Sequence, residues 1–234
     1  MREEQAVPVS KESIGHNIQV LRGRIENACC RSKRDAAEVK LIAVTKNLAP
    51  TVIRTTYDCG LRDFGENRIQ ESIAKYVELT DIRQELTLHF MGHLQTNKAR
   101  DALQIVDIIH SIDTVRLASL LNEKASSPLP AFLQVNLAGE QTKYGFSRGE
   151  LDRAVDTISA LANIQILGLM TIAPICSDAE EVRPIFADLR RLNLAYGFKE
   201  LSMGMTDDFE VAVEEGATML RIGRAIFGER SCVL

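Results

Sequence analysis

The sequence lacks any long apolar run. No stretch approaches the roughly 18–20 apolar residues that a helix needs to span a bilayer. The first ten residues, Met1–Ser10, are polar and carry Arg2, Glu3 and Glu4, so they lack the apolar core of a signal peptide. We therefore expect no membrane anchor and no secretory leader, and we expect a cytoplasmic protein.

A basic excess and paired cysteines are also missing. The net charge is −4, from 28 Lys and Arg against 32 Asp and Glu, which argues against a nucleic-acid-binding surface. The five cysteines are odd in number, and no two of them have the C-x-x-C spacing of a zinc or redox site. We expect reduced thiols at all of these positions: Cys29, Cys30, Cys59, Cys176 and Cys232.

The chain has no low-complexity segment and no stretch that reads as a linker. Its 234 residues fit the 200–250 that α/β barrels commonly reach as one domain. We therefore expect a single domain over residues 1–234, with a monomer as the simplest state.

What the sequence does contain is an alternation of short apolar runs and amphipathic stretches. The segment Ser10–Arg34 predicts an opening helix with Ser10 as its N-cap. Eight strands are expected at Val39–Thr45, Leu61–Phe64, Leu86–Met91, Ile105–His110, Ala131–Val135, Ile164–Met170, Glu200–Ser202 and Thr218–Ile222. Helices are expected between them, at Pro50–Cys59, Arg68–Thr80, Lys98–Gln104, Thr114–Ala125, Arg148–Ala162, Asp178–Tyr196 and Asp207–Glu215. This order favours a closed (β/α)₈ TIM-type barrel with an extra N-terminal helix, and an open doubly wound sheet is the alternative.

Two loops have the composition of a phosphate site. They are Ser202-Met203-Gly204-Met205-Thr206 after the seventh strand and the segment Arg221–Gly228 after the eighth. Barrels often bind phosphate at these two loops, where glycine allows close backbone approach and hydroxyls donate hydrogen bonds. Thr206 is also a candidate N-cap for the helix that follows. The alternative is that these residues serve only as turn formers.

Lys46 follows the first strand at the expected catalytic rim. Barrel closure brings the first strand beside the eighth, so Lys46 is expected to face the phosphate loops. A partly desolvated amine can attack a carbonyl to form a Schiff base. The combination suggests pyridoxal phosphate or a phosphorylated carbonyl substrate, against the alternative of a lysine that points into water.

Several longer motifs resemble one known family. The chain is similar to the YggS/PROSC family, the pyridoxal phosphate homeostasis proteins, whose barrel resembles that of alanine racemase (fold type III). The matching motifs are Ala43-Val44-Thr45-Lys46, Phe64-Gly65-Glu66-Asn67-Arg68, His89-Phe90-Met91-Gly92-His93, Gly168-Leu169-Met170, Leu201-Ser202-Met203-Gly204-Met205-Thr206-Asp207-Asp208 and Arg221-Ile222-Gly223.

The resemblance implies roles for seven residues. It implies that Lys46 carries pyridoxal 5′-phosphate as an internal aldimine and that Asn67 lies near the cofactor ring. It further implies that Arg221 faces the pyridine nitrogen, which stays unprotonated beside a permanent cation and makes the ring a weaker electron sink. The phosphate ligands implied by the family are Ser202, Thr206, Gly223 and Arg224. Asn67 has a second interpretation, as the N-cap of the following helix.

Two functional classes follow from this site. The first is a binding protein that buffers pyridoxal phosphate and passes it transiently to apoenzymes, with no catalytic residue and no turnover. The second is a small amino-acid racemase, which needs a proton donor opposite Lys46. A Schiff-base aldolase is a weaker third reading. No tyrosine suits the donor role, because all four fall in expected helices or an exposed loop: Tyr57, Tyr76, Tyr144 and Tyr196.

We expect no metal site. His89 and His93 have H-x-x-x-H spacing, which suggests a metal only where both lie on a helix. His89 falls in an expected strand, where residues four apart are about 13 Å apart. No glutamate follows it as a zinc hydrolase motif requires.

Overall fold

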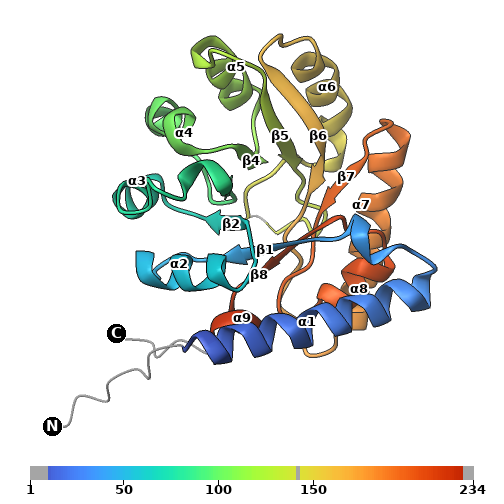
Figure 1. Ribbon diagram of the computed structural model, residues 1–234. Helices are drawn as coiled ribbons and strands as arrows, with labels where there is room; N and C mark the ends of the chain where they lie inside the picture. The colour runs from blue at the N-terminus through green and yellow to red at the C-terminus, as the bar shows by residue number, and fades with distance from the viewer. Residues whose placement is uncertain (1–9, 141–142, 229–234) are drawn as a thin grey trace, which may run out of the picture.

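A computed structural model describes residues 10–140 and 143–228. Eight parallel strands form a closed barrel in the chain order β1 to β8, which confirms the predicted barrel and excludes the open sheet (Figure 1). The strands are β1 Lys40–Val44, β2 Asp63–Glu66, β3 Thr87–Phe90, β4 Ile108–Ile112, β5 Leu129–Gln134, β6 Ile164–Met170, β7 Glu200–Ser202 and β8 Met219–Ile222.

Helices alternate with these strands and surround them (Figure 1). The α-helices are α1 Lys11–Ser32, α2 Pro50–Asp58, α3 Ile69–Val77, α4 Ala99–Ile105, α5 Val115–Lys124, α6 Arg148–Ser159, α7 Arg183–Ala195, α8 Phe209–Glu214 and α9 Arg224–Phe227. Short 3₁₀ turns lie at Ala36–Glu38, Arg83–Glu85, Thr96–Lys98 and Ala179–Val182.

The fourth strand begins later than predicted. The expected start at Ile105 is wrong, because Ile105 is the last residue of α4. The Val106 N–H still donates to the carbonyl of Ala102 at 2.9 Å, so the helix ends only there. The Asp107 N–H then bonds the carbonyl of Leu88 at 2.9 Å, and β4 starts at Ile108. Apolar periodicity alone does not separate the end of a buried helix from the start of a buried strand.

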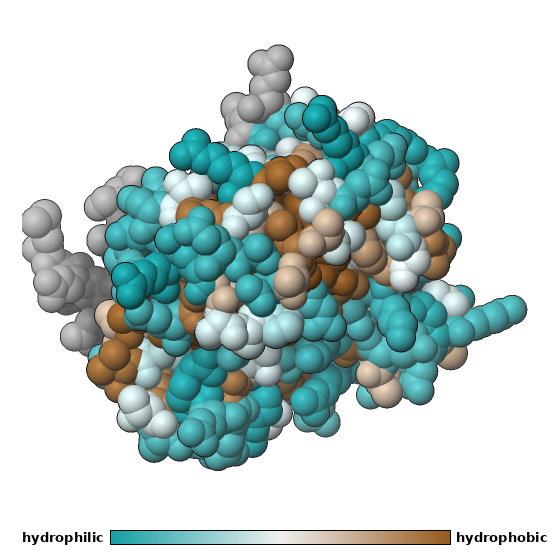
Figure 2. Space-filling view, turned by 90° about the horizontal axis from the view of Figure 1, so that it is seen from above, coloured by the Kyte–Doolittle hydropathy of each residue, from teal (hydrophilic) through white to brown (hydrophobic). Residues whose placement is uncertain are grey.

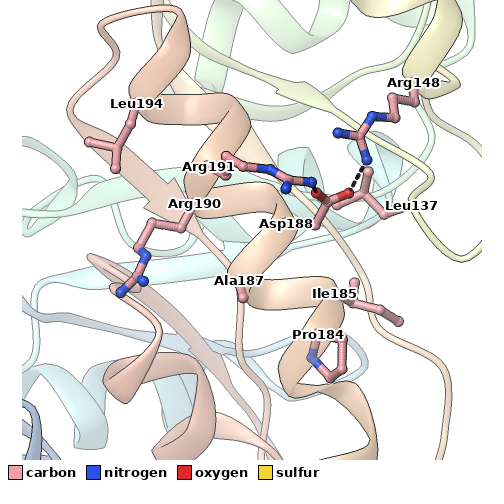
Figure 3. Close-up of a pocket in the computed structure, with 9 residues that line it drawn as sticks. All are labelled: Leu137, Arg148, Pro184, Ile185, Ala187, Asp188, Arg190, Arg191 and Leu194. Carbon is pink, nitrogen blue, oxygen red and sulfur yellow. Dashed lines mark hydrogen bonds and ion pairs between the residues drawn. The ribbon is translucent and has the colours of Figure 1, made fainter.

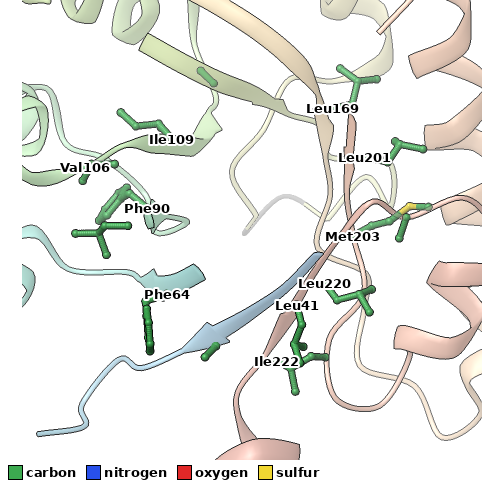
Figure 4. Close-up of a cluster of buried hydrophobic side chains, with 14 of the residues drawn as sticks. Leu41, Phe64, Phe90, Val106, Ile109, Leu169, Leu201, Met203, Leu220 and Ile222 are labelled. Carbon is green, nitrogen blue, oxygen red and sulfur yellow. The ribbon is translucent and has the colours of Figure 1, made fainter. Parts of the chain in front are cut away.

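The two faces of the strands supply two layers of the core. Outward-facing side chains pack between the barrel and the helices, among them Leu41, Phe64, Leu169 and Leu220 (Figure 4). The barrel interior holds a smaller apolar cluster of Ile42, Phe132, Met170 and Met219. This alternation follows from the two-residue period of a strand, and it fills the barrel with side chains.

Gly65 illustrates how tightly the interior is filled. A Cβ at this position in β2 would lie 2.4 Å from Cε of Met91 and 3.2 Å from Cγ2 of Ile42. A side chain at this position would therefore displace the end of Met91, and Asp63, two residues earlier on β2, faces the interior as well.

Helix α1 packs against the last two described helices, α8 and α9. Ser10 caps it as predicted, accepting a hydrogen bond from the N–H of Ser13 at 3.1 Å. The helix runs beside α8 and α9 (Figure 1). Arg24 and Arg31 both pair with Glu210 of α8, at 2.7 and 2.9 Å. Helix α1 thus covers the two helices that precede and follow β8.

The outer surface is largely hydrophilic on the face shown in Figure 2, where hydrophobic residues gather in smaller patches between hydrophilic ones. Of the helices in residues 10–140 and 143–228, none is long and apolar enough to cross a membrane.

Candidate cofactor site

Lys46 and Asn67 lie at neighbouring strand ends. Val44 of β1 pairs with Gly65 of β2, and Lys46 and Asn67 each follow two residues later. Residues two apart on a strand share a face, so both positions continue the inner face of the barrel. The sequence-predicted neighbours therefore meet at the carboxyl end of the barrel, where barrels carry their functional sites.

The loops after β7 and β8 touch each other. The Ala225 N–H, in the first turn of α9, bonds Oγ1 of Thr206 at 3.4 Å. Arg224 forms an ion pair with Asp207 across the same gap. Because β8 pairs with β1 through Ile222 and Ala43, these loops stand beside the segment that carries Lys46. The predicted proximity of the lysine to both loops is consistent with this strand order.

The predicted capping role of Thr206 is wrong. Asp208 occupies the N-cap position of α8, and its Oδ1 accepts a hydrogen bond from the N–H of Met205 at 2.6 Å. Asp207 and Asp208 therefore still belong to the turn, and α8 begins at Phe209. Thr206 instead faces α9, the short helix that begins directly after Gly223.

Arg221 and Ser202 lie inside the barrel. The Arg221 side chain is 4% exposed and Ser202 is fully buried. Nη1 of Arg221 donates to Oγ of Ser202, and Nη2 donates to the carbonyl of Thr171, both at 2.7 Å. Burial lowers the pKa of Arg221 to about 10, which still leaves it a cation at neutral pH. The role of Ser202 as a phosphate donor stays a prediction, since its hydroxyl is engaged here.

Asn67 carries a polar atom without a partner. Its side-chain Oδ1 is buried and has no hydrogen bond among the described residues. The capping interpretation of Asn67 is wrong, because α3 starts at Ile69 with Arg68 at its N-cap position. Asn67 lines a hollow at the ends of β2 and β3. Arg68, His93 and Lys98 line the same hollow. An orphaned buried acceptor of this kind favours a ligand with a hydrogen-bond donor.

A buried ion cluster holds the backbone on both sides of Lys46. Nζ of Lys75 donates to the carbonyl of Thr45 at 2.8 Å and contacts Oε1 of Glu66 at 3.0 Å. On the other side, the Asn47 N–H donates to Glu71, which also pairs with Lys75. Asn47 has φ 59°, the left-handed conformation that asparagine tolerates better than most residues. Lys46 itself is half-buried between these two anchors.

Sequence reasoning did not find this cluster. Glu66 and Lys75 are both buried, and Lys75 is four residues after Glu71 on α3. An i,i+4 acidic and basic pair on a helix ordinarily faces solvent. The available signal was a glutamate directly at the end of a buried strand, where a charge needs a partner.

The two spaced histidines have separate partners. Nδ1 of His93 pairs with Asp113 at 2.8 Å, and its ring stacks on Tyr144 with centroids 3.7 Å apart. His89 instead contacts His110 and Asp63 inside the barrel. Within residues 10–140 and 143–228, no three His, Cys, Asp or Glu side chains gather in a metal-binding arrangement.

The four tyrosines differ in their access to the barrel mouth. Tyr57 and Tyr196 bond Glu85 and Asp152 through their hydroxyls, while the Tyr76 hydroxyl is buried without a partner among the described residues. Tyr144 follows β5 and stacks on His93, which places it at the carboxyl end of the barrel. Tyr144 is therefore the candidate for the proton donor that the racemase alternative requires.

Another hollow lies on the outer surface, along α7 (Figure 3). Asp188 there pairs with Arg148 at 2.7 Å and also with Arg191. None of the seven predicted cofactor residues lines this hollow.

Comparison with known proteins agrees with this arrangement. A family model described as alanine racemase, N-terminal domain, matches residues 9–231. The pyridoxal phosphate homeostasis protein of Aquifex aeolicus is 43% identical over 218 residues, covering 88% of this chain and 94% of that one. Its counterpart from Pseudomonas aeruginosa is 39% identical over 223 residues, with 93% and 96% covered.

Solved structures extend the comparison to the fold. PipY of Synechococcus elongatus PCC7942, with pyridoxal phosphate bound, superposes with a TM-score of 0.81 at 39% identity, covering 92% of this chain and 100% of that one. Alanine racemase from Corynebacterium glutamicum shares the fold, with a TM-score of 0.72 at 17% identity over 95% of this chain and 63% of its own. The chain therefore belongs to the family of pyridoxal phosphate homeostasis proteins, built on the alanine racemase N-terminal barrel.

Proposed function

We propose that this protein binds pyridoxal 5′-phosphate on Lys46 and acts in pyridoxal phosphate homeostasis, by buffering the cofactor and delivering it to apoenzymes. The observation that carries the proposal is the position of Lys46, pinned on both sides and adjacent through β1–β8 pairing to the two loops predicted to hold phosphate. We further propose that residues 1–234 form one domain that works as a monomer in the cytoplasm.

The donor set of this structure suits the cofactor. A buried guanidinium at Arg221 complements an unprotonated ring nitrogen. The hydroxyl of Thr206 and the first turn of α9, which begins after Gly223, offer donors to a phosphate. Arg224 adds a positive charge at the same loop.

Each residue has a defined task in this proposal. Lys46 would hold the cofactor covalently through its side-chain amine. Thr206, Gly223 and Arg224 would bind the phosphate, and Arg221 would keep the ring nitrogen unprotonated. When bound, the cofactor would supply a carbonyl carbon that bonds reversibly to this amine, so that the cofactor can be released to a recipient apoenzyme.

Replacing Thr206 with valine tests the phosphate assignment. The change keeps the shape and removes the hydroxyl, so we expect about tenfold weaker binding of pyridoxal phosphate, the cost of one hydrogen bond to a charged group. Binding of pyridoxal, which has no phosphate, should not change. Thr157→Val, at an exposed helical threonine on α6 that bonds the Arg153 carbonyl, is the control. Equal losses for both ligands in Thr206→Val would contradict the assignment.

The racemase remains the alternative function, and Tyr144 at the barrel mouth is the observation that keeps it open. The deciding experiment follows loss of the α-proton of alanine in D₂O while the loaded protein is also mixed with a pyridoxal phosphate-dependent apoenzyme. The homeostasis proposal predicts recovery of the apoenzyme's activity and no exchange above the free cofactor. Exchange that Tyr144→Phe abolishes, without transfer, would favour the racemase.

A further inference from the structure

Five polar side chains form a continuous hydrogen-bonded column inside the barrel. Nε2 of His89 contacts Oδ1 of Asp63 at 2.9 Å, and Nδ1 of His89 contacts Nε2 of His110 at 2.8 Å. Nδ1 of His110 contacts Oγ of Ser202 at 2.8 Å, and Ser202 accepts from Nη1 of Arg221 at 2.7 Å. The column therefore crosses the interior from β2 through β3, β4 and β7 to β8.

The group at one end of the column fixes the direction of its hydrogen bonds once both histidines are neutral. Arg221 can only donate. Burial alone would raise the pKa of Asp63, but the hydrogen bond from His89 and the charge of Lys40, 3.2 Å away, lower it below its ordinary value. Asp63 is therefore a carboxylate that can only accept. With two neutral histidines, this acceptor leaves one consistent arrangement along the column.

In that arrangement both histidines are neutral and carry their proton on Nε2. His89 and His110 are fully buried, and burial lowers the pKa of both below the ordinary value. His89 donates from Nε2 to Asp63 and accepts at Nδ1 from His110. His110 in turn accepts the hydroxyl proton of Ser202 at its Nδ1. The only hydrogen of the Ser202 hydroxyl is thus donated to His110 and is not available to a phosphate.

The column also restrains the guanidinium of Arg221. One of its terminal nitrogens is held by Ser202, and the other by the carbonyl of Thr171, at the ends of β7 and β6. Two contacts at different nitrogens fix the plane of the group. His110 is itself restrained by stacking on Phe132, with ring centroids 4.5 Å apart. A buried network in which every member has a partner specifies one geometry.

We propose that Asp63, His89, His110 and Ser202 are positioning residues that orient Arg221 toward the cofactor ring, and that Ser202 serves this column rather than the phosphate. The inference rests on the proposed binding of pyridoxal phosphate. It explains why histidines unrelated to any metal group lie inside the barrel on β3 and β4. The column also connects Arg221 to the ion pair between Lys40 and Asp63. These two residues are the first of β1 and β2, at the ends of the strands away from Lys46.

Ser202→Ala and His110→Phe each interrupt the column and test its role. Both should shift the visible spectrum of the bound cofactor and weaken pyridoxal and pyridoxal phosphate alike, each by about tenfold. The ratio of the two affinities should stay that of the wild type. Ile109→Val removes one methyl group from the neighbouring β4 residue, which packs in the core outside the column, and it should leave the spectrum unchanged.

Other outcomes would overturn the column. If Ser202→Ala lost affinity for pyridoxal phosphate but not for pyridoxal, Ser202 would be a phosphate ligand and not a member of the column. Lower stability with an unchanged spectrum in both variants would reduce the column to a structural element. A wild-type protein that binds no pyridoxal phosphate would instead overturn the proposed function, so the two failures can be told apart.

The unmodified protein gives a test that does not depend on variants folding. ¹⁵N shifts of its labelled histidines report which ring nitrogen carries the proton. Neutral Nε2–H forms are expected for His89 and His110. A proton on Nδ1 of His110 would reverse its bond to Ser202 and contradict the proposal.

Discussion

Replacing Lys46 with alanine should abolish the visible absorbance of the bound cofactor. The C=N bond that produces the absorbance needs the lysine amine. The contacts of Thr206, Gly223 and Arg224 with the phosphate should remain. We therefore expect binding to weaken on the order of a hundredfold rather than vanish, equivalent to about 2.7 kcal/mol. Absorbance titration and equilibrium dialysis measure the two effects separately.

Lys124→Ala is the matched control for this change, because Lys124 lies exposed on α5, away from the barrel mouth. It should bind pyridoxal phosphate with the wild-type spectrum and affinity. An unaltered visible band in Lys46→Ala would refute the assignment of Lys46. Loss of the band in both variants would show that the spectrum reports something other than the Lys46 bond.

Replacing Lys75 with methionine should destabilise the fold by about 3–5 kcal/mol, the usual cost of removing one partner from a buried ion pair. Glu66 is fully buried, and Lys75 is its main charged partner, with Nζ 3.0 Å from Oε1. Methionine fills a similar volume, so the effect comes from the lost charge and hydrogen bonds. Urea unfolding at pH 7 measures the difference, and a loss below about 1 kcal/mol would contradict the account.

The pH dependence of this variant follows from Glu66. Burial raises the pKa of Glu66, and Lys75 offsets that effect only in part. Without Lys75 the pKa should rise further. Because the unfolded state is common to both proteins, the variant's deficit should grow as pH rises through the raised Glu66 pKa of the folded wild type, and it should level off above the still higher pKa of the variant. It should shrink at lower pH, where the carboxyl is protonated in both states.

A double variant separates charge from shape. Glu66→Gln together with Lys75→Met removes both charges, so it should recover much of the stability lost in Lys75→Met. Because Lys75 also holds the Thr45 carbonyl, the double variant should still bind pyridoxal phosphate less tightly than the wild type. Full recovery of both properties would show that the cluster does not position Lys46.

The fold could be predicted because its signals are local. Most strands, such as β1 and β6, contain short apolar runs, and some helices begin at a recognisable cap, such as Ser10 before α1. The start of β4 was misplaced because Ile105 continues the apolar pattern while still in α4. The capping role of Thr206 failed because Asp208, two residues on, is an equally suitable cap and holds the turn through Met205.

Strand ends alone predict only the rim of the candidate site, whereas Arg221 and Ser202 inside the barrel were suggested by the family resemblance. Lys46, Asn67 and the loops at Thr206 and Gly223 follow strand ends, and the position of strand ends is fixed by the barrel. The interior column depends on contacts between residues far apart in sequence: Ser202 lies 92 residues from its partner His110. No sequence period marks such a contact. A buried polar residue in an apolar strand reveals that it needs a partner but not which one.

The most direct test of the central claim is borohydride reduction of the purified, cofactor-loaded protein followed by peptide mapping. The account predicts that reduction removes the visible band and leaves one pyridoxyl group per chain, on the peptide that contains Lys46. A pyridoxyl group on another lysine, or no visible band after incubation with pyridoxal phosphate, would contradict it.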